Sequence, residues 1–283
     1  MSAPAAAADL APRSRTWADS ESPLCDGGFR SHRGSFAPAQ AADVVSSNIV
    51  GYQRLAIPAE GYALLANPFV EVGTGTTGQP VGYEINEMFA DDTENSTAGN
   101  SAGLGDQIQV WDSSTQGYDT YFFSARAGNA WADVSTPRVA SDVSFEFGDG
   151  YWYLNRAKDA YTLTVSGEVS TKEVQVTLAA SGYTLVCNPF PADLPLNSEN
   201  IDWATAGSTA GNSAGLGDQI QLWDIETQGY DTYFFSARAG NAWADVGSPR
   251  VATTESIPAG QGFWYLNRGT SPITITLKSP IAE

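Results

Sequence analysis

The chain has 283 residues, of which 42% are hydrophobic and 11% aromatic, and its formal net charge is −18. This apolar fraction is enough to build packed cores, which excludes a chain that is disordered throughout. The negative charge argues against binding to nucleic acid or to anionic membrane surfaces, because both would repel the protein. No apolar run is long enough to span a membrane as a helix.

Residues 1–45 are expected to form a disordered tail, since they are rich in Ala, Pro, Ser and Arg and show no periodicity. Within them, Ala39-Gln40-Ala41 resembles the small-residue cleavage site of a secretory signal, but the apolar segment that should precede it is absent. Two interpretations stay open. Either a misassigned start or a frame error has damaged a signal peptide, or the tail is a plain disordered one with a chance match.

The second half of the chain nearly repeats the first. Residues 96–134 and 208–246 differ at only three pairs of positions, which are Val110/Leu222, Ser113/Ile225 and Ser114/Glu226. The same offset of 112 relates YWYLNR (151–156) to FWYLNR (263–268), and upstream YALLANPF (62–69) matches YTLVCNPF (183–190) at an offset of 121. We call residues aligned in this way counterparts. A period this long is that of a small domain rather than a solenoid repeat, so we expect two domains, residues 46–169 and 170–283.

Both repeats show the pattern of β-strands, because short β-branched and aromatic runs alternate with clusters of Gly, Asn, Asp and Ser. Strands are predicted at 49–57, 61–67, 107–112, 118–125, 151–155 and 160–166, and again at 173–178, 182–188, 219–224, 230–237, 263–267 and 272–278. Residues 118–125 carry aromatics on both faces, which indicates a central strand with Phe122 buried. Residues 81–92 and 196–207 favour a helical turn or two, with Ser198 as a helix N-cap. The predicted fold class is all-β, with two tandem homologous β-sandwich or barrel-like domains and a short junction at 165–174.

Six short motifs follow one another along the first repeat. They are SSNIVGYQ (46–53), YALLANPF (62–69), QVWD (109–112), GYDTYFF (117–123), GDGYWYLNR (148–156) and LTVSGEV (163–169). In this order they resemble a tandem β-repeat domain of secreted, mostly uncharacterised bacterial surface and extracellular proteins. The resemblance covers about residues 46–283. It implies export and a β-fold, and it implies no activity.

Catalytic motifs are absent from the repeats. The one histidine, His32, lies in the tail, which excludes Ser-His-Asp and Cys-His catalysis and His-ligated zinc in the repeats. No CxxC pair, P-loop or dinucleotide fingerprint occurs. We therefore predict that the protein is not an enzyme. Cys187, in an apolar strand pattern, is expected to be a buried thiol.

The loop GNSAGLGDQ (99–107) and its copy offer oxygen atoms that could hold a calcium ion, a cation that favours oxygen ligands from flexible loops. The candidate calcium ligands are Asn100 and Asp106 in the first repeat and Asn212 and Asp218 in the second. The alternative is a Gly/Asn/Ser turn in which the Asp accepts a hydrogen bond from a backbone N–H. No other cofactor is indicated.

Aromatic residues suggest a second kind of site. Trp131 and Trp243 lie in polar GNAWAD loops, and Tyr118 and Tyr230 lie in strands close to Trp and Gln residues, so these four residues are the candidates for binding a sugar. The alternative is that the Trp residues cover the ends of small cores, where aromatic burial contributes most.

The first functional hypothesis is a non-catalytic secreted or cell-surface protein with a structural or adhesive role. The alternative is a pair of carbohydrate-binding modules, in which two weak sites gain by avidity. The expected partner is an extracellular glycan or a surface protein. The near-identity of the loops indicates either a recent duplication or use of both loop sets, and the sequence leaves this open.

Overall fold

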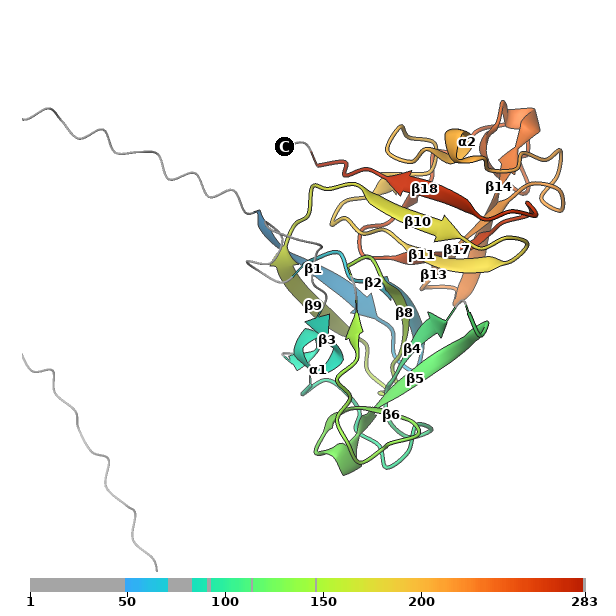
Figure 1. Ribbon diagram of the computed structural model, residues 1–283. Coiled ribbons are helices and arrows are strands. Elements are labelled where there is room, and N and C mark those ends of the chain that lie inside the picture. The colour runs from blue at the N-terminus through green and yellow to red at the C-terminus, as the bar shows by residue number, and fades with distance from the viewer. Residues whose placement is uncertain (1–48, 71–82, 91–92, 113, 146, 282–283) are drawn as a thin grey trace, which may run out of the picture. The chain divides into compact units, whose positions relative to one another are not determined.

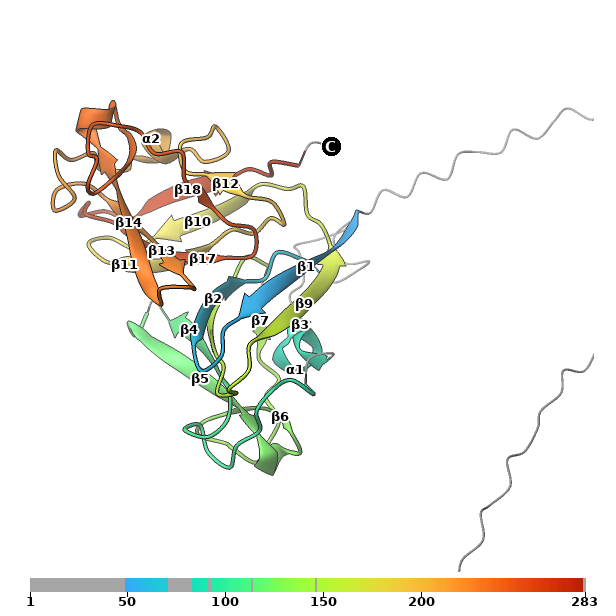
Figure 2. The ribbon, with the colours of Figure 1, turned by 180° about the vertical axis from the view of Figure 1, so that it is seen from behind.

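The computed structural model describes residues 49–70, 83–90, 93–112, 114–145 and 147–281, and residues 46–283 form one compact unit (Figures 1 and 2). The described part is all-β, as predicted, with two short helices, α1 (Ile85–Met88) and α2 (Trp203–Ala206), and the 3-10 turns η2 (Ala125–Ala127) and η3 (Ala237–Ala239). None of its helices is long and apolar enough to cross a membrane. The tail, with its cleavage motif and His32, lies outside the described residues.

The described residues contain eighteen strands. Those of the first half are β1 (Val50–Ile57), β2 (Tyr62–Ala66), β3 (Tyr83–Glu84), β4 (Gln107–Asp112), β5 (Gly117–Ser124), β6 (Ala130–Asp133), β7 (Ser144–Phe145), β8 (Gly150–Leu154) and β9 (Tyr161–Glu168). Those of the second half are β10 (Val174–Leu178), β11 (Tyr183–Cys187), β12 (Leu194–Pro195), β13 (Gln219–Asp224), β14 (Gly229–Ser236), β15 (Ala242–Asp245), β16 (Ser256–Ile257), β17 (Gly262–Leu266) and β18 (Ile273–Leu277).

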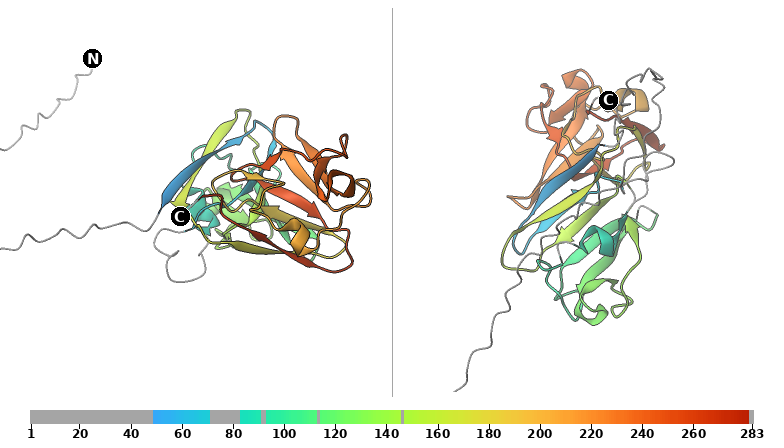
Figure 3. Two further views of the ribbon diagram at one scale, coloured as in Figure 1. Left: turned by 90° about the horizontal axis from the view of Figure 1, so that it is seen from above. Right: turned by 90° about the vertical axis from the view of Figure 1, so that its left-hand side faces the viewer.

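The strands form the same set of sheets in each half. Figure 3 shows the two halves from two further directions, with the first half from blue to yellow-green and the second from yellow to red. The first half has a five-stranded sheet in the order β2-β8-β4-β5-β6 and the two-stranded sheets β1-β9 and β3-β7. The second half has β11-β17-β13-β14-β15 with β10-β18 and β12-β16. Within the described residues, no sheet takes strands from both halves.

All of the predicted strands are present within two residues of their predicted bounds. Six strands were not predicted, namely β3, β6, β7, β12, β15 and β16, because runs of two to four residues are too short to show an alternation. Each predicted helical segment does contain one short helix. The predicted N-cap is wrong, however, since α2 begins after Asp202 and not after Ser198.

Alternation along the strands gives each five-stranded sheet an inner face toward its own core and an outer face away from it. Ile108, Phe123 and Tyr153 lie on the inner face of the first sheet and belong to its core, which is a separate cluster from the core of the second half. Phe122, on the outer face, is also buried, so β5 is a central strand with both faces covered, as expected. Phe234, Leu154 and Leu266 are buried as well.

The outer faces carry aromatic side chains and one leucine each that belong to neither core cluster. By register, the first sheet presents Tyr62, Leu64, Trp111, Tyr118 and Trp152 on this face, and the second presents the counterparts Tyr183, Leu185, Trp223, Tyr230 and Trp264.

Tyr151 provides a test of the inner face. Its side chain is fully buried and its hydroxyl has no hydrogen-bond partner among the described residues, whereas the counterpart is Phe263. Since an unpaired buried hydroxyl is unfavourable, we expect Tyr151→Phe to raise the free energy of unfolding by about 1 kcal/mol, measured by urea denaturation.

The matched control is Tyr153→Phe on the same strand. The Tyr153 hydroxyl donates a hydrogen bond to Asp106, so its removal should lower stability. A loss of stability in both variants would contradict this assignment of the two hydroxyls.

Candidate functional site

The carboxylate of Asp106 is fully buried and accepts three hydrogen bonds from the protein. Its Oδ2 accepts from the backbone N–H of Thr97 at 2.9 Å and from the hydroxyl of Tyr153 at 3.1 Å, and its Oδ1 accepts from the backbone N–H of Arg156 at 2.7 Å. Thr97 precedes the 99–107 loop, and Arg156 follows β8. The carboxylate therefore connects the start of this loop to the end of a central strand.

The second half repeats this arrangement around Asp218. Its buried carboxylate accepts from the N–H of Thr209 at 2.8 Å, the hydroxyl of Tyr265 at 2.7 Å and the N–H of Arg268 at 2.6 Å. The same atoms of counterpart residues take part in both halves, so the duplicated acids have a shared structural role.

Glycines allow the loop to fold closely around this carboxylate. A Cβ atom on Gly99 would overlap the backbone of Gly105, and a Cβ atom on Gly105 would lie 2.5 Å from the carbonyl oxygen of Phe123. Glycine is therefore required at both positions, because the backbone segments of the loop and of β5 lie too close together for a side chain.

Two further pairs of polar residues, which the sequence did not single out, hold the neighbouring loops. The Asn86 amide donates to the carbonyls of Trp131 and Ser141 and accepts from the N–H of Trp131, and Asn197 bonds Trp243 in the same way. The Ser124 hydroxyl donates to the carbonyl of Pro137 at 2.6 Å, as the counterpart Ser236 does to the carbonyl of Pro249. An Asn or Ser whose partner is a distant backbone group leaves no local pattern in the sequence.

Two acids of the first half, Asp106 and Asp112, respond to pH in opposite ways. Burial raises the pKa of the Asp106 carboxyl above its usual value of 3.8, outweighing the hydrogen bonds it accepts. Its contribution to stability is therefore fully present below pH 3.8 and is lost as the pH rises through the folded-state pKa. Hydrogen bonds from Ser114 and Thr115 lower the pKa of the exposed Asp112 to about 2, so its contribution is present above pH 3.8 and is lost as the pH falls toward 2.

The calcium candidates do not form an open ligand set. Asp106 and Asp218 are buried with both oxygens engaged, whereas Asn100 and Asn212 are exposed. Among the described residues, no three His, Cys, Asp or Glu residues lie together as metal ligands would. The arrangement corresponds to the alternative interpretation, in which the Asp accepts hydrogen bonds from backbone N–H groups.

The structure buries both loop tryptophans, which corresponds to the alternative interpretation of their role. Trp131 and Trp243 have 0% exposed surface and pack in the two cores, so neither ring can form a surface platform for a sugar. Polar neighbours suggested a loop, but AWAD forms the short strands β6 and β15, whose inner-face residue is the Trp.

The other two sugar candidates remain accessible. Tyr118 and Tyr230 are each 43% exposed, and each packs on the neighbouring Trp of its own outer face with ring centroids 5.0 Å apart, Tyr118 on Trp111 and Tyr230 on Trp223.

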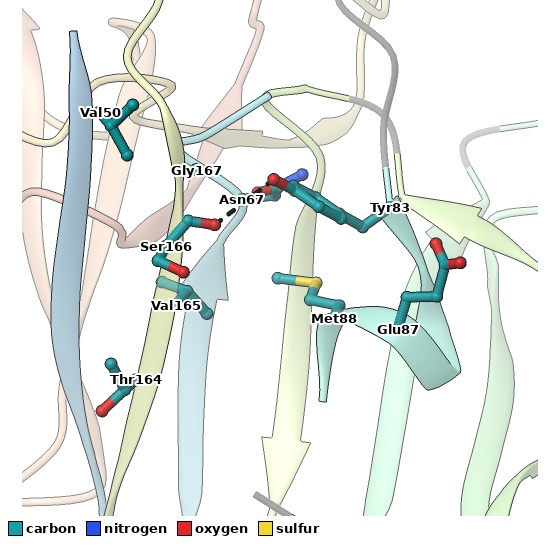
Figure 4. Close-up of a pocket in the computed structure, with 9 residues that line it drawn as sticks. All are labelled: Val50, Asn67, Tyr83, Glu87, Met88, Thr164, Val165, Ser166 and Gly167. Atoms are coloured by element: carbon teal, nitrogen blue, oxygen red, sulfur yellow. Dashed lines mark hydrogen bonds between the residues drawn. The ribbon is translucent and has the colours of Figure 1, made fainter. Parts of the chain in front are cut away.

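A cavity of about 220 Å³ is lined by Val50, Asn67, Tyr83, Glu87, Met88 and residues 164–167 (Figure 4). Among the described residues, the buried Asn67 Nδ2 finds no hydrogen-bond partner, whereas its counterpart in Asn188 donates to three carbonyl oxygens. Residues 71–82, which precede Tyr83 in the sequence, lie outside the described part, and we assign this cavity no ligand.

Cys187 is a buried free thiol, as predicted, and burial raises its pKa well above the usual value. A thiol in this state is a poor nucleophile at neutral pH.

No protein-family model matches the chain, and no curated protein and no solved structure shows significant similarity to it. The resemblance to secreted bacterial β-repeat domains therefore stays a prediction from the motifs.

Removing the buried carboxylate should destabilise the fold. In Asp106→Ala the N–H groups of Thr97 and Arg156 lose their acceptor, so we expect the free energy of unfolding to fall by at least about 2 kcal/mol in urea denaturation. Asp218→Ala should behave alike.

The control is Asp119→Ala, which removes an exposed acid of β5 and should leave stability nearly unchanged. Equal stability of Asp106→Ala and Asp119→Ala would show that the buried carboxylate does not organise the loop.

Proposed function

We propose that the protein is a non-catalytic structural or adhesive protein, secreted or displayed at the cell surface, built from two tandem homologous β-domains at residues 46–169 and 170–283. The observation that carries this proposal is that the duplicated polar residues are engaged inside the fold. The buried acids bond backbone groups, and the described residues hold no cluster of metal-ligating side chains.

Matching sheet order and register support the two-domain part of the proposal. Gln107 pairs with Phe122 between β4 and β5, and the counterparts Gln219 and Phe234 pair between β13 and β14. The order of strands in the five-stranded sheets corresponds position by position.

An adhesive role is supported by what the rigid loops present to solvent. The loops near the buried acids expose aliphatic side chains at the same positions in both repeats. These are Leu104, Val134 and Val139 with their counterparts Leu216, Val246 and Val251. Because hydrogen bonds already order these loops, binding through them would require little further loss of conformational entropy.

Binding of the labelled full-length chain to arrays of glycans and of purified extracellular proteins would test this role. We expect Leu104→Asp or Leu216→Asp to weaken capture and the double variant to abolish it, because two linked sites together exceed either affinity by about 10²–10⁴. Val50→Asp changes a similarly exposed side chain outside these loops and should leave capture unchanged. Equal loss in this control, or turnover of a captured target, would contradict the proposal.

A carbohydrate-binding pair is the second candidate, favoured by the exposure of Tyr118 and Tyr230 beside Trp111 and Trp223. Isothermal titration with polysaccharides separates the two functions. Sugar binding would be supported if the heat of polysaccharide binding disappears in the Tyr118→Ala/Tyr230→Ala variant but remains in the Leu104→Asp/Leu216→Asp variant.

Calcium should not stabilise the protein, since Asp106 and Asp218 have no free carboxylate oxygen. A site filled at ten times its dissociation constant would add about 1.4 kcal/mol to the free energy of unfolding. We therefore expect identical melting temperatures in millimolar calcium and in chelator. An upward shift that is lost in Asn100→Ala/Asn212→Ala would restore the calcium hypothesis.

A further inference from the structure

The outer faces of the two five-stranded sheets contact each other through reciprocal tryptophan pairs. Trp111 packs edge to face on Trp264, with centroids 5.0 Å apart and an interplanar angle of 88°. Trp223 packs on Trp152 at 4.9 Å and 87°. Trp223 is the counterpart of Trp111, and Trp264 is the counterpart of Trp152. Each contact therefore recurs when the two halves are exchanged, as in the isologous interface of a twofold dimer.

The close approach of the sheets is reciprocal as well. A Cβ atom on Gly150 would lie 3.4 Å from the Leu185 side chain, and one on Gly262 would lie 3.0 Å from the Leu64 side chain. Gly150 and Gly262 are counterparts, as are Leu64 and Leu185. The glycine of each sheet thus receives the leucine of the other.

This contact is separate from what holds each half together. The four tryptophans at the contact are members of neither core cluster, and the buried members of each cluster all come from one half. Each half consequently has its own core and, in addition, an aromatic face that fits its counterpart.

Other contacts favour pairing of a first half with a second half over pairing of two first halves or two second halves. Tyr62 of the first half donates its N–H to Gln228 Oε1 at 2.8 Å, and its carbonyl accepts from Trp223 Nε1 at 3.1 Å. In the reciprocal pair, the counterpart atom Trp111 Nε1 is buried with no hydrogen-bond partner in the described structure. Ile225, whose counterpart is Ser113, packs against the core of the first half. A first half therefore fits a second half better than another first half.

We propose that this face also binds a second copy of the chain by exchange of halves, so that the first half of one chain pairs with the second half of another. All of the contacts above join first half to second half, and the same contacts form whether the halves belong to one chain or to two. The covalent link is short, from Val169 to Glu173 between β9 and β10, and short hinge loops favour exchange. Protein concentration then decides between the closed monomer and the exchanged dimer. This inference does not depend on the proposed function.

The test uses the full chain with a protease recognition sequence inserted between Lys172 and Glu173, which are both exposed. The protein is concentrated, warmed below its unfolding temperature, cooled and separated by size exclusion with light scattering. We expect a dimer fraction that grows with concentration. Cleavage should convert that dimer to particles of monomer mass, each holding one first half and one second half. A dimer that keeps its mass after cleavage would overturn the proposal, as would the absence of any dimer or separation of the cleaved monomer into free halves.

A paired variant tests the face itself. In Trp111→Ala/Trp223→Ala both reciprocal pairs are lost while the core clusters keep all their members, so circular dichroism should stay native. We expect the cleaved halves of this variant to dissociate with a Kd at least tenfold higher than those of the parent. Val139→Ala, at an exposed loop position, should leave the Kd unchanged. An unchanged Kd in the tryptophan variant, with native circular dichroism, would contradict the assignment of this face.

Discussion

Burial of one carboxylate in each half is the constraint on which the loops depend. A buried carboxyl group is unfavourable unless hydrogen-bond partners surround it, and here three donors from two separate segments meet on Asp106 and again on Asp218. Replacing the Asp, or adding a Cβ atom at Gly99 or Gly105, would leave donors unpaired or force the backbone apart. Packing constraints of this kind preserve a loop as strictly as a ligand would, which gives a physical reason for near-identical loops without a bound cation.

Alternation along the chain was enough to locate the long strands and to tell which side chains share a face. It could not locate β6 and β15, because a four-residue strand between Gly/Asn and Asp/Ser looks like a polar loop. These strands are fixed by distant groups, since the amide of Asn86 bonds both the N–H and the carbonyl of Trp131. The sequence therefore leaves the exposure of Trp131 open, and the structure places it in the core.

The site predictions depended in the same way on what covers each surface. A period of two places Trp111 on the face opposite Ile108, but it says nothing of the partner of that face. In the structure that partner is the equivalent face of the other half, where Trp264 packs on Trp111. Gln and aromatic residues on one strand face are typical of a sugar platform and equally of a contact between sheets. Of the four sugar-binding candidates, Tyr118 and Tyr230 keep enough exposure to serve the first purpose.

The three differences between the near-identical segments all lie in the hairpin formed by β4 and β5 or by β13 and β14. The loops around the buried acids have not changed, whereas the Ser113/Ile225 and Val110/Leu222 pairs differ in their apolar side chains. Leu222 belongs to the second core, and Ile225 packs against the first. Two identical halves would pair equally well in every combination. An isoleucine present in one copy alone breaks this equivalence, because Ile225 of the second half packs against the core of the first.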